Sequence, residues 1–138
     1  MPKKYAARSY GKAVVNTMTI QMLPQEFTVC KISSLQHIDL MQNFTFLSKT
    51  DDEISLVCES AYVPTNIIVA EPNWKGLRVS GVLDFGMIGV IAKISNVLAA
   101  ASISIFVVST YNTDYIFVKT ENYDKCTQAL TQAGYEVK

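Results

Sequence analysis

The sequence is poor in the residues that catalysis and metal binding most often use. Its 138 residues contain one histidine, His37, and three widely spaced cysteines, Cys30, Cys58 and Cys126, without a CxxC pair. A zinc site or a histidine-dependent triad would need unusual partners. An odd number of widely spaced cysteines indicates that they are small, buried hydrophobic side chains of a protein in a reducing compartment. We therefore expect a cytoplasmic protein with no metal and no cofactor, and a surface or loop position for His37.

Net charge and long apolar runs are also missing. Twelve basic residues balance twelve acidic residues, so the broad positive surface of a nucleic-acid-binding protein is absent. No apolar run reaches the roughly 18–20 residues that are needed to span a membrane. A composition of 49% hydrophobic and 17% charged residues is that of a globular protein. These totals predict no nucleic-acid partner and no membrane partner.

The charges that are present are unevenly distributed. Residues 1–17 carry four basic groups and no acid, whereas the remaining residues carry eight basic and twelve acidic groups. This pattern predicts a basic flexible leader over residues 1–17, outside the folded core. The alternatives are a targeting segment of the transit type, or an upstream extension ahead of a more natural start near Met18.

The second half of the chain alternates between strand and helix patterns. In order, the patterns predict a strand over 77–83, a helix over 87–101, a strand over 103–109, a turn over 110–114, a strand over 115–118, a helix capped by Asn122, and a strand over 135–137. Met87, Ile88, Val90 and Ile91 are expected in the core, and Gly134 at a helix end with positive φ. The order β-α-β-β-α-β is that of a split βαβ unit.

The first half resembles a degenerate repeat of the same order of elements. Shifting it by 61 positions lays Phe44–Val57 over Ile105–Val118 without a gap, with Glu53 opposite Asp114. The short segments after the strands, one of which contains Pro64, leave little room for helices. The predicted fold is α+β, with two tandem ferredoxin-like βαββαβ units. Its parts are the leader over 1–17, a degenerate unit over 18–71, a linker over 72–76 and a complete unit over 77–138.

Three stretches resemble the ACT-domain group that is related to the CASTOR arginine sensors. They are Trp74-x-x-Leu77-x-Val79-x-Gly81-x-Leu83-Asp84-Phe85-x-x-x-Gly89-Val90, Ile103-Ser104-Ile105-Phe106-x-x-Ser109-Thr110-Tyr111-x-Thr113-Asp114-Tyr115 and Thr50-Asp51-Asp52-Glu53-Ile54-Ser55-Leu56-Val57-Cys58. The bacterial members of the group are small proteins with two tandem ACT-like units, and the resemblance covers about residues 20–138. It implies a ferredoxin-like fold, side-by-side pairing of units, and binding of a small ligand, usually an amino acid, between units.

The sequence departs from this group at three positions. Many relatives have proline in place of Val82, glycine in place of Ser102 and aspartate in place of Asn112. The loss of glycine removes the easiest residue with which to end a helix. The loss of aspartate changes the charge beside the pocket, so the identity of the ligand does not carry over.

The predicted ligand site is centred on the start of the helix that follows Asp84. An amino acid presents a carboxylate and an ammonium group on one carbon. Backbone N–H groups at a glycine-flanked helix start suit the carboxylate, while Asp84 and Asp114 suit the ammonium. Glu53 is the equivalent acid of the first half. The predicted ligand-binding residues are Asp84, Phe85, Gly86, Met87, Ile88, Gly89, Ser109, Thr110, Asn112, Thr113 and Asp114.

Each of these features also has a purely structural explanation. Asp84 is suited to cap the helix, a role worth about 1 kcal/mol. The glycines are suited to a tight turn and to close packing of helix on sheet. Asn112 and Asp114 are ordinary turn residues. Trp74 is expected to pack as a lid over the core near the linker.

The sequence is compatible with three classes of function. The leading hypothesis is a non-catalytic regulatory or sensor protein that binds an amino acid, forms a homodimer and acts on an unidentified partner enzyme. The alternative is a structural or protein-interaction module that dimerises through ACT sheets or helices without a ligand. A small enzyme that uses Asp84 and Asp114 in acid/base catalysis ranks last, because no cofactor motif, P-loop or nucleophile elbow accompanies them.

Overall fold

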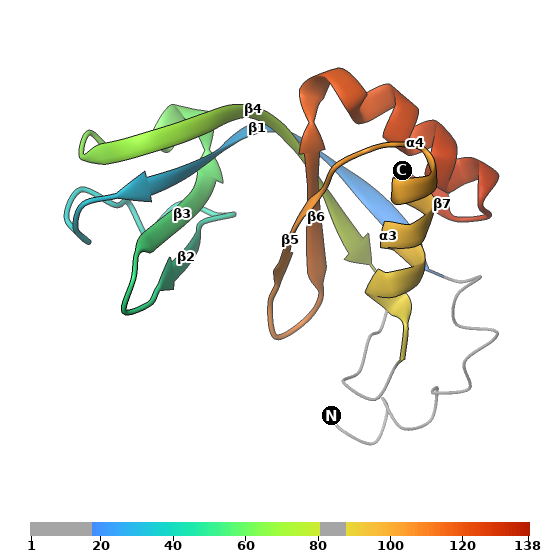
Figure 1. Cartoon of the computed structure of the whole chain (residues 1–138), viewed down its shortest axis with the longest axis horizontal. Helices are drawn as coiled ribbons and strands as arrows, with labels where there is room; N and C mark the ends of the chain where they lie inside the picture. Colours follow the sequence, from blue (N-terminus) through green and yellow to red (C-terminus); the bar gives the residue numbers. More distant parts are fainter. Residues whose placement is uncertain (1–17, 81–87) are drawn as a thin grey trace. The chain divides into compact units, whose positions relative to one another are not determined.

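The fold is α+β, with an antiparallel sheet and few helices, as expected from the sequence. A computed structural model describes residues 18–80 and 88–138, so the predicted leader 1–17 lies outside the described residues. In chain order the elements are β1 (Thr19–Ile32), β2 (Phe46–Lys49), β3 (Ile54–Glu59), the 3₁₀ helix η1 (Ser60–Tyr62), β4 (Ile67–Ser80), α3 (Val90–Ala100), β5 (Phe106–Ser109), β6 (Asp114–Lys119), the 3₁₀ helix η2 (Thr120–Asn122), α4 (Tyr123–Gln132) and β7 (Glu136–Val137) (Figure 1).

The chain divides into two compact units. The all-β unit is Pro24–Lys75, and the α+β unit combines the described residues of 1–23 and 76–138. The boundary between the units falls within the predicted linker 72–76, but these residues continue β4 and do not form a loop. Proline, asparagine and glycine usually interrupt a strand. Here the irregular backbone is at Asn73, which has a φ of +70°. The half-buried Trp74 next to it donates from Nε1 to the carbonyl of Glu71 at 3.0 Å.

The all-β unit is built from four strands in the order β2-β3-β1-β4. β1 and β3 are antiparallel, with Phe27 opposite Glu59, and so are β2 and β3, with Phe46 opposite Val57. One buried cluster of this unit consists of Cys30, Ile32, Leu56 and Cys58, and Phe27 and Val57 are also buried. Between Pro24 and Lys75, all of which is described, the only helical turn is η1. The predicted loss of helices from the first half is confirmed.

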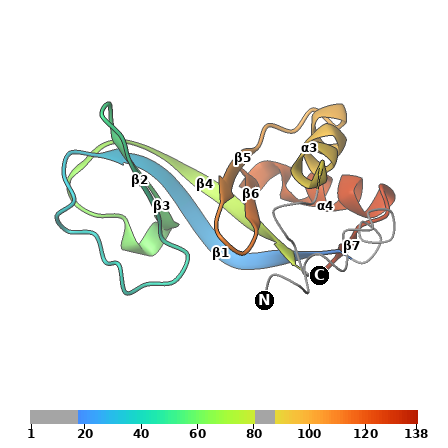
Figure 2. The same cartoon turned by 90° about the horizontal axis from the view of Figure 1, so that it is seen from below.

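The α+β unit has its strands in the order β7-β1-β4-β6-β5. Figure 2 shows α3 and α4 on the same side of these strands. Strand residues spaced by two and helix residues spaced by four point into the core between them. That core consists of Met18, Ile20, Leu77, Val79, Ile94, Leu98, Ile103, Ile116, Val118, Cys126, Leu130 and Tyr135. The predicted helical stripe over 87–101 is thus confirmed for the part described.

Both long helices end in the same way. The N–H of Ile103 donates to the carbonyl of Leu98 at 2.9 Å, and the N–H of Tyr135 donates to that of Leu130 at 3.1 Å. Such bonds are typical of the Schellman motif at a helix C-terminus, in which the residue just before the donor takes a positive φ. That residue is Ser102 after α3, at +60°, and Gly134 after α4, at +100°. The prediction for Gly134 is confirmed.

Other predictions need correction at the ends of elements. Asn122 is the N-cap of α4, but its side chain makes no capping hydrogen bond, because η2 leads directly into the helix. The strand predicted over 103–109 is limited to Phe106–Ser109. Ile88, which was expected in the core, is 94% exposed, since it precedes the helix and is not part of its apolar stripe.

The two hairpins correspond at an offset of 60 residues, not 61. Phe46 of β2 corresponds to Phe106 of β5, and Ile54 of β3 to Asp114 of β6. A slip of one residue reverses the face on which a strand side chain lies. In the corrected register Glu53 corresponds to Thr113, so Glu53 is not the structural equivalent of Asp114.

Candidate functional site

The start of α3 has the open geometry expected for one part of the site. Gly89 is the N-cap with a φ of +79°, and no side chain caps the helix. The first intrahelical bond runs from the N–H of Lys93 to the carbonyl of Gly89 at 2.9 Å, so the preceding N–H groups have no partner in the helix. The N-cap position considered for Asp84 belongs to Gly89. Four of the predicted residues, Asp84, Phe85, Gly86 and Met87, lie outside the described residues.

The hairpin between β5 and β6 brings together five other predicted residues. Thr110 closes the turn, because its N–H and its Oγ1 donate to the carbonyl of Thr113 at 2.8 and 2.9 Å. Ser109 Oγ donates to Asp114 Oδ1 at 2.5 Å and holds this carboxylate at the base of the hairpin. Asn112 is exposed at its tip. The threonines therefore have structural roles, while the Ser109–Asp114 pair presents a fixed acid.

One hydrogen bond connects this hairpin to β4. Thr113 Oγ1 donates to the carbonyl of Val79, which lies just before the chain enters residues 81–87. The hairpin and the strand that leads toward Asp84 are thus neighbours. Ile88 and Gly89 belong to the opposite end of that same connection, at the start of α3.

A hydrogen-bonded arginine that the sequence patterns did not reveal lies on β4, with partners on β1 and β6. Arg78 donates from Nε and Nη2 to Gln21 Oε1 at 3.1 and 2.8 Å, and from Nη1 to the hydroxyl of Tyr115 at 3.3 Å. Its guanidinium is 5.8 Å from the centre of the Tyr115 ring, a cation–π distance. The available signal was an arginine between two apolar residues of the strand, Leu77 and Val79. These contacts hold the positive charge of Arg78 against Tyr115, the residue that follows Asp114 in β6.

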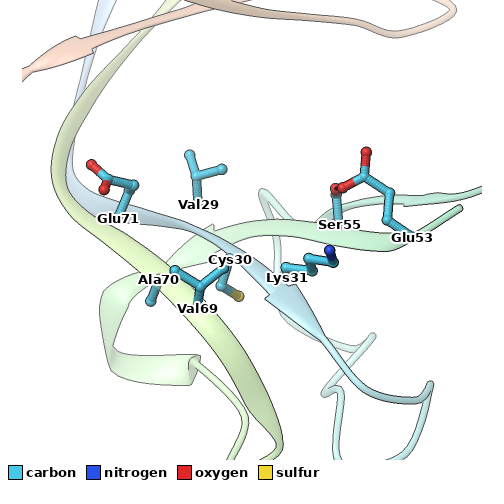
Figure 3. Close-up of a pocket in the computed structure, with 8 residues that line it drawn as sticks. All are labelled: Val29, Cys30, Lys31, Glu53, Ser55, Val69, Ala70 and Glu71. Atoms are coloured by element: carbon cyan, nitrogen blue, oxygen red, sulfur yellow. Dashed lines mark hydrogen bonds between the residues drawn. The ribbon is translucent and has the colours of Figure 1, made fainter.

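The all-β unit has a shallow open depression of about 220 Å³. Figure 3 shows Val29 and Glu71 on one side of the ribbon and Cys30 and Ala70 on the other. The charges at its rim come from Lys31, Glu53 and Glu71, and the remaining lining residues are Val29, Cys30, Ser55, Val69 and Ala70. One cation between two acids matches the charges of an amino acid. All three charged side chains are exposed, however, so water weakens their attraction for a ligand.

The cysteines are buried and free, as predicted. Burial raises the pKa of Cys58 to about 11, with smaller contributions from Cys30 and Glu59, and it raises the pKa of Cys126 to about 11. Thiols of such high pKa are poor nucleophiles. His37 is exposed, also as predicted.

The part of the chain that the structure describes contains no cluster suited to a metal ion. Across residues 18–80 and 88–138, no three histidine, cysteine, aspartate or glutamate side chains are grouped so that they could hold one. Nor do these residues form a helix that is long and apolar enough to cross a membrane.

Residues 69–132 match the family model of the ACT domain. The match extends from β4 to the end of α4 and includes all the predicted site residues. The resemblance drawn from the sequence is therefore supported at the level of the ACT domain.

Solved structures show the same fold. A protein from Agobacterium tumefaciens has a TM-score of 0.77 at 25% identity, over 88% of this chain and 92% of that one. The regulatory subunit of aspartate kinase from Thermus thermophilus has a TM-score of 0.59 at 9% identity, over 83% and 95%. Aspartate kinase from Clostridium acetobutylicum, an allosteric enzyme, has a TM-score of 0.61 at 17% identity, over 85% of this chain and 34% of the enzyme.

Proposed function

We propose that this protein is a non-catalytic regulatory or sensor protein of the cytoplasm that binds an amino acid. The observation that carries the proposal is the ACT-domain match over residues 69–132, because it covers both the start of α3 and the β5–β6 hairpin. Similarity in fold to a regulatory subunit of aspartate kinase agrees with a regulatory role. The Trp74–Val90 and Ile103–Tyr115 motifs favour the CASTOR-related group within this family.

The site geometry supports a ligand with a carboxylate and an ammonium group. The uncapped N-terminus of α3 offers N–H groups and the positive end of a helix dipole to the carboxylate. Asp114, held by Ser109, offers a carboxylate to the ammonium. We infer that the all-β unit is a second ACT-like unit without its helices, since its hairpin matches that of the α+β unit strand for strand. One complete site per chain is then expected.

The test is a thermal-shift panel of the standard amino acids and related metabolites on the whole chain. A ligand at 100 times its Kd adds about 2.7 kcal/mol to the free energy of unfolding, a shift of several degrees. Asp114→Asn is expected to reduce this shift at the same ligand concentration. The matched control is Asp124→Asn, in the first turn of α4 and outside the predicted site. No shift with any compound would contradict amino-acid binding.

A further inference from the structure

Two exposed apolar side chains lie at the two parts of the proposed ligand site. Among the residues of the α+β unit that the structure describes, Ile88 and Tyr111 are the only large hydrophobic side chains that are exposed, at 94% and 75%. Ile88 directly precedes Gly89, the N-cap of α3, and Tyr111 is in the turn between β5 and β6. Single exposed apolar residues are ordinary on a protein surface, but these two accompany the polar groups assigned to the ligand.

The topology places both side chains at the same end of the α+β unit. β4 and β6 are neighbours in the sheet, and Thr113 Oγ1 donates to the carbonyl of Val79, near the end of β4. The turn that contains Tyr111 therefore lies where β4 ends. α3 is the next element along the chain, and Figure 1 shows its start and the β5–β6 turn at the same end of the unit.

The all-β unit contains a turn of the same construction between β2 and β3. The N–H of Thr50 donates to the carbonyl of Glu53 at 2.9 Å, and the N–H of Thr110 donates to that of Thr113 at 2.8 Å. In both turns the N–H of the last residue donates back to the threonine Oγ1, at 3.2 and 3.3 Å. The two turns thus provide an internal comparison in which the backbone is the same and the side chains at the tip differ.

This comparison shows that the fold does not require a tyrosine at the tip of the turn. At the offset of 60 residues, Tyr111 and Asn112 correspond to Asp51 and Asp52. Aspartate is an ordinary turn residue, and both aspartates are exposed. An exposed aromatic ring in a turn that forms equally well with aspartate has no role in folding that the structure shows, which points to a role in binding.

We propose that Ile88 and Tyr111 contact the side chain of the bound amino acid and select one that is apolar, either aliphatic or aromatic. The inference rests on the proposed function, in which the start of α3 holds the carboxylate and Asp114 holds the ammonium. A ligand fixed by these two groups has its side chain free to cover the two exposed apolar residues. Each CH₂ group that is removed from water tightens binding about fourfold. A basic side chain would instead favour an acid at the tip, as at Asp51, and neither Tyr111 nor Asn112 is charged.

The test is isothermal titration calorimetry of the whole chain with individual amino acids. Leucine, isoleucine and phenylalanine are expected to bind at least about tenfold more tightly than alanine, because they cover more apolar surface. Lysine, arginine and glutamate are expected to bind no more tightly than alanine. Alanine has the same carboxylate and ammonium as leucine, so the ratio of the alanine Kd to the leucine Kd measures the side-chain contact alone.

Two variants locate this contact. Ile88→Ser and Tyr111→Ser are each expected to lower the ratio by about threefold or more, to leave the Kd of alanine nearly unchanged, and to keep the melting temperature of the unliganded chain, since both side chains are exposed. Met41→Ser, at a loop residue that is 89% exposed, is the matched control and is expected to leave the ratio unchanged.

The outcomes separate this inference from the proposed function. A ratio near one in the wild type, tighter binding of a charged amino acid than of leucine, or an unchanged ratio in both variants would overturn the selection of an apolar side chain, while amino-acid binding itself would stand. Failure of every amino acid to bind would contradict the proposed function, and this inference with it.

Discussion

The end of α3 allows a stabilising substitution to be predicted with a definite sign. Ser102 adopts a φ of +60° and is exposed. A residue with a Cβ loses about 1–2 kcal/mol in the left-handed region, whereas glycine loses about 0.5–1 kcal/mol in additional backbone entropy. Ser102→Gly is therefore expected to raise the free energy of unfolding by about 0.5–1 kcal/mol. For a chain of this length the melting temperature rises by about 2–4 °C, as measured by calorimetry or urea denaturation.

The matched control is the reverse change at the end of α4. Gly134 has a φ of +100°, and a Cβ built on it meets no atom within 4 Å. Gly134→Ser is therefore expected to cost about 1 kcal/mol through backbone strain alone. If Ser102→Gly lowered stability, or if both substitutions changed it in the same direction, backbone conformation would not be what controls stability at these two helix ends.

Three further outcomes are expected. Thr113→Val removes the hydrogen bond to the end of β4 and should lower the free energy of unfolding, measured by urea denaturation, by about 1 kcal/mol. Thr110→Val should lower it by less, because the hydroxyl of Thr110 bonds only within its turn. Equal losses would contradict a stabilising role for the bond between the hairpin and β4. Leu98→Ala, at a fully buried position of α3, should cost about 2–5 kcal/mol, unlike a change at an exposed helix position. The unfolded chain loses thiol protons near pH 9, whereas Cys58 and Cys126 keep theirs to about pH 11 in the folded chain. The free energy of unfolding should therefore fall as the pH rises from 9 to 11, by on the order of 1 kcal/mol per thiol. Substitution of both cysteines by alanine should flatten this slope.

Much of the α+β unit could be predicted from local sequence patterns. Ile94 and Leu98 repeat at helical spacing, and Leu77 and Val79 at strand spacing, and all four are buried. The φ of Gly134 was also predictable, since a residue after a helix that must take a positive φ is most often glycine.

The candidate site was predictable only in part. Ser109 and Asp114 form a pair because they are opposite each other in the hairpin, and this follows from the local turn. Arg78 was missed, because a single basic residue in a strand does not reveal its partners. Those partners, Gln21 and Tyr115, are on strands distant in sequence.

The sequence by itself determined which segments form strands and helices, since side-chain periodicity and backbone preferences act over a few residues. Only the tertiary structure decided how those segments pair. The last strand, β7, lies parallel to β1 from the other end of the chain, with Ile20 opposite Val137, and β1 and β4 each serve both units. Strand partners are selected by backbone hydrogen bonding and by burial between segments distant in sequence, and no local pattern records that choice.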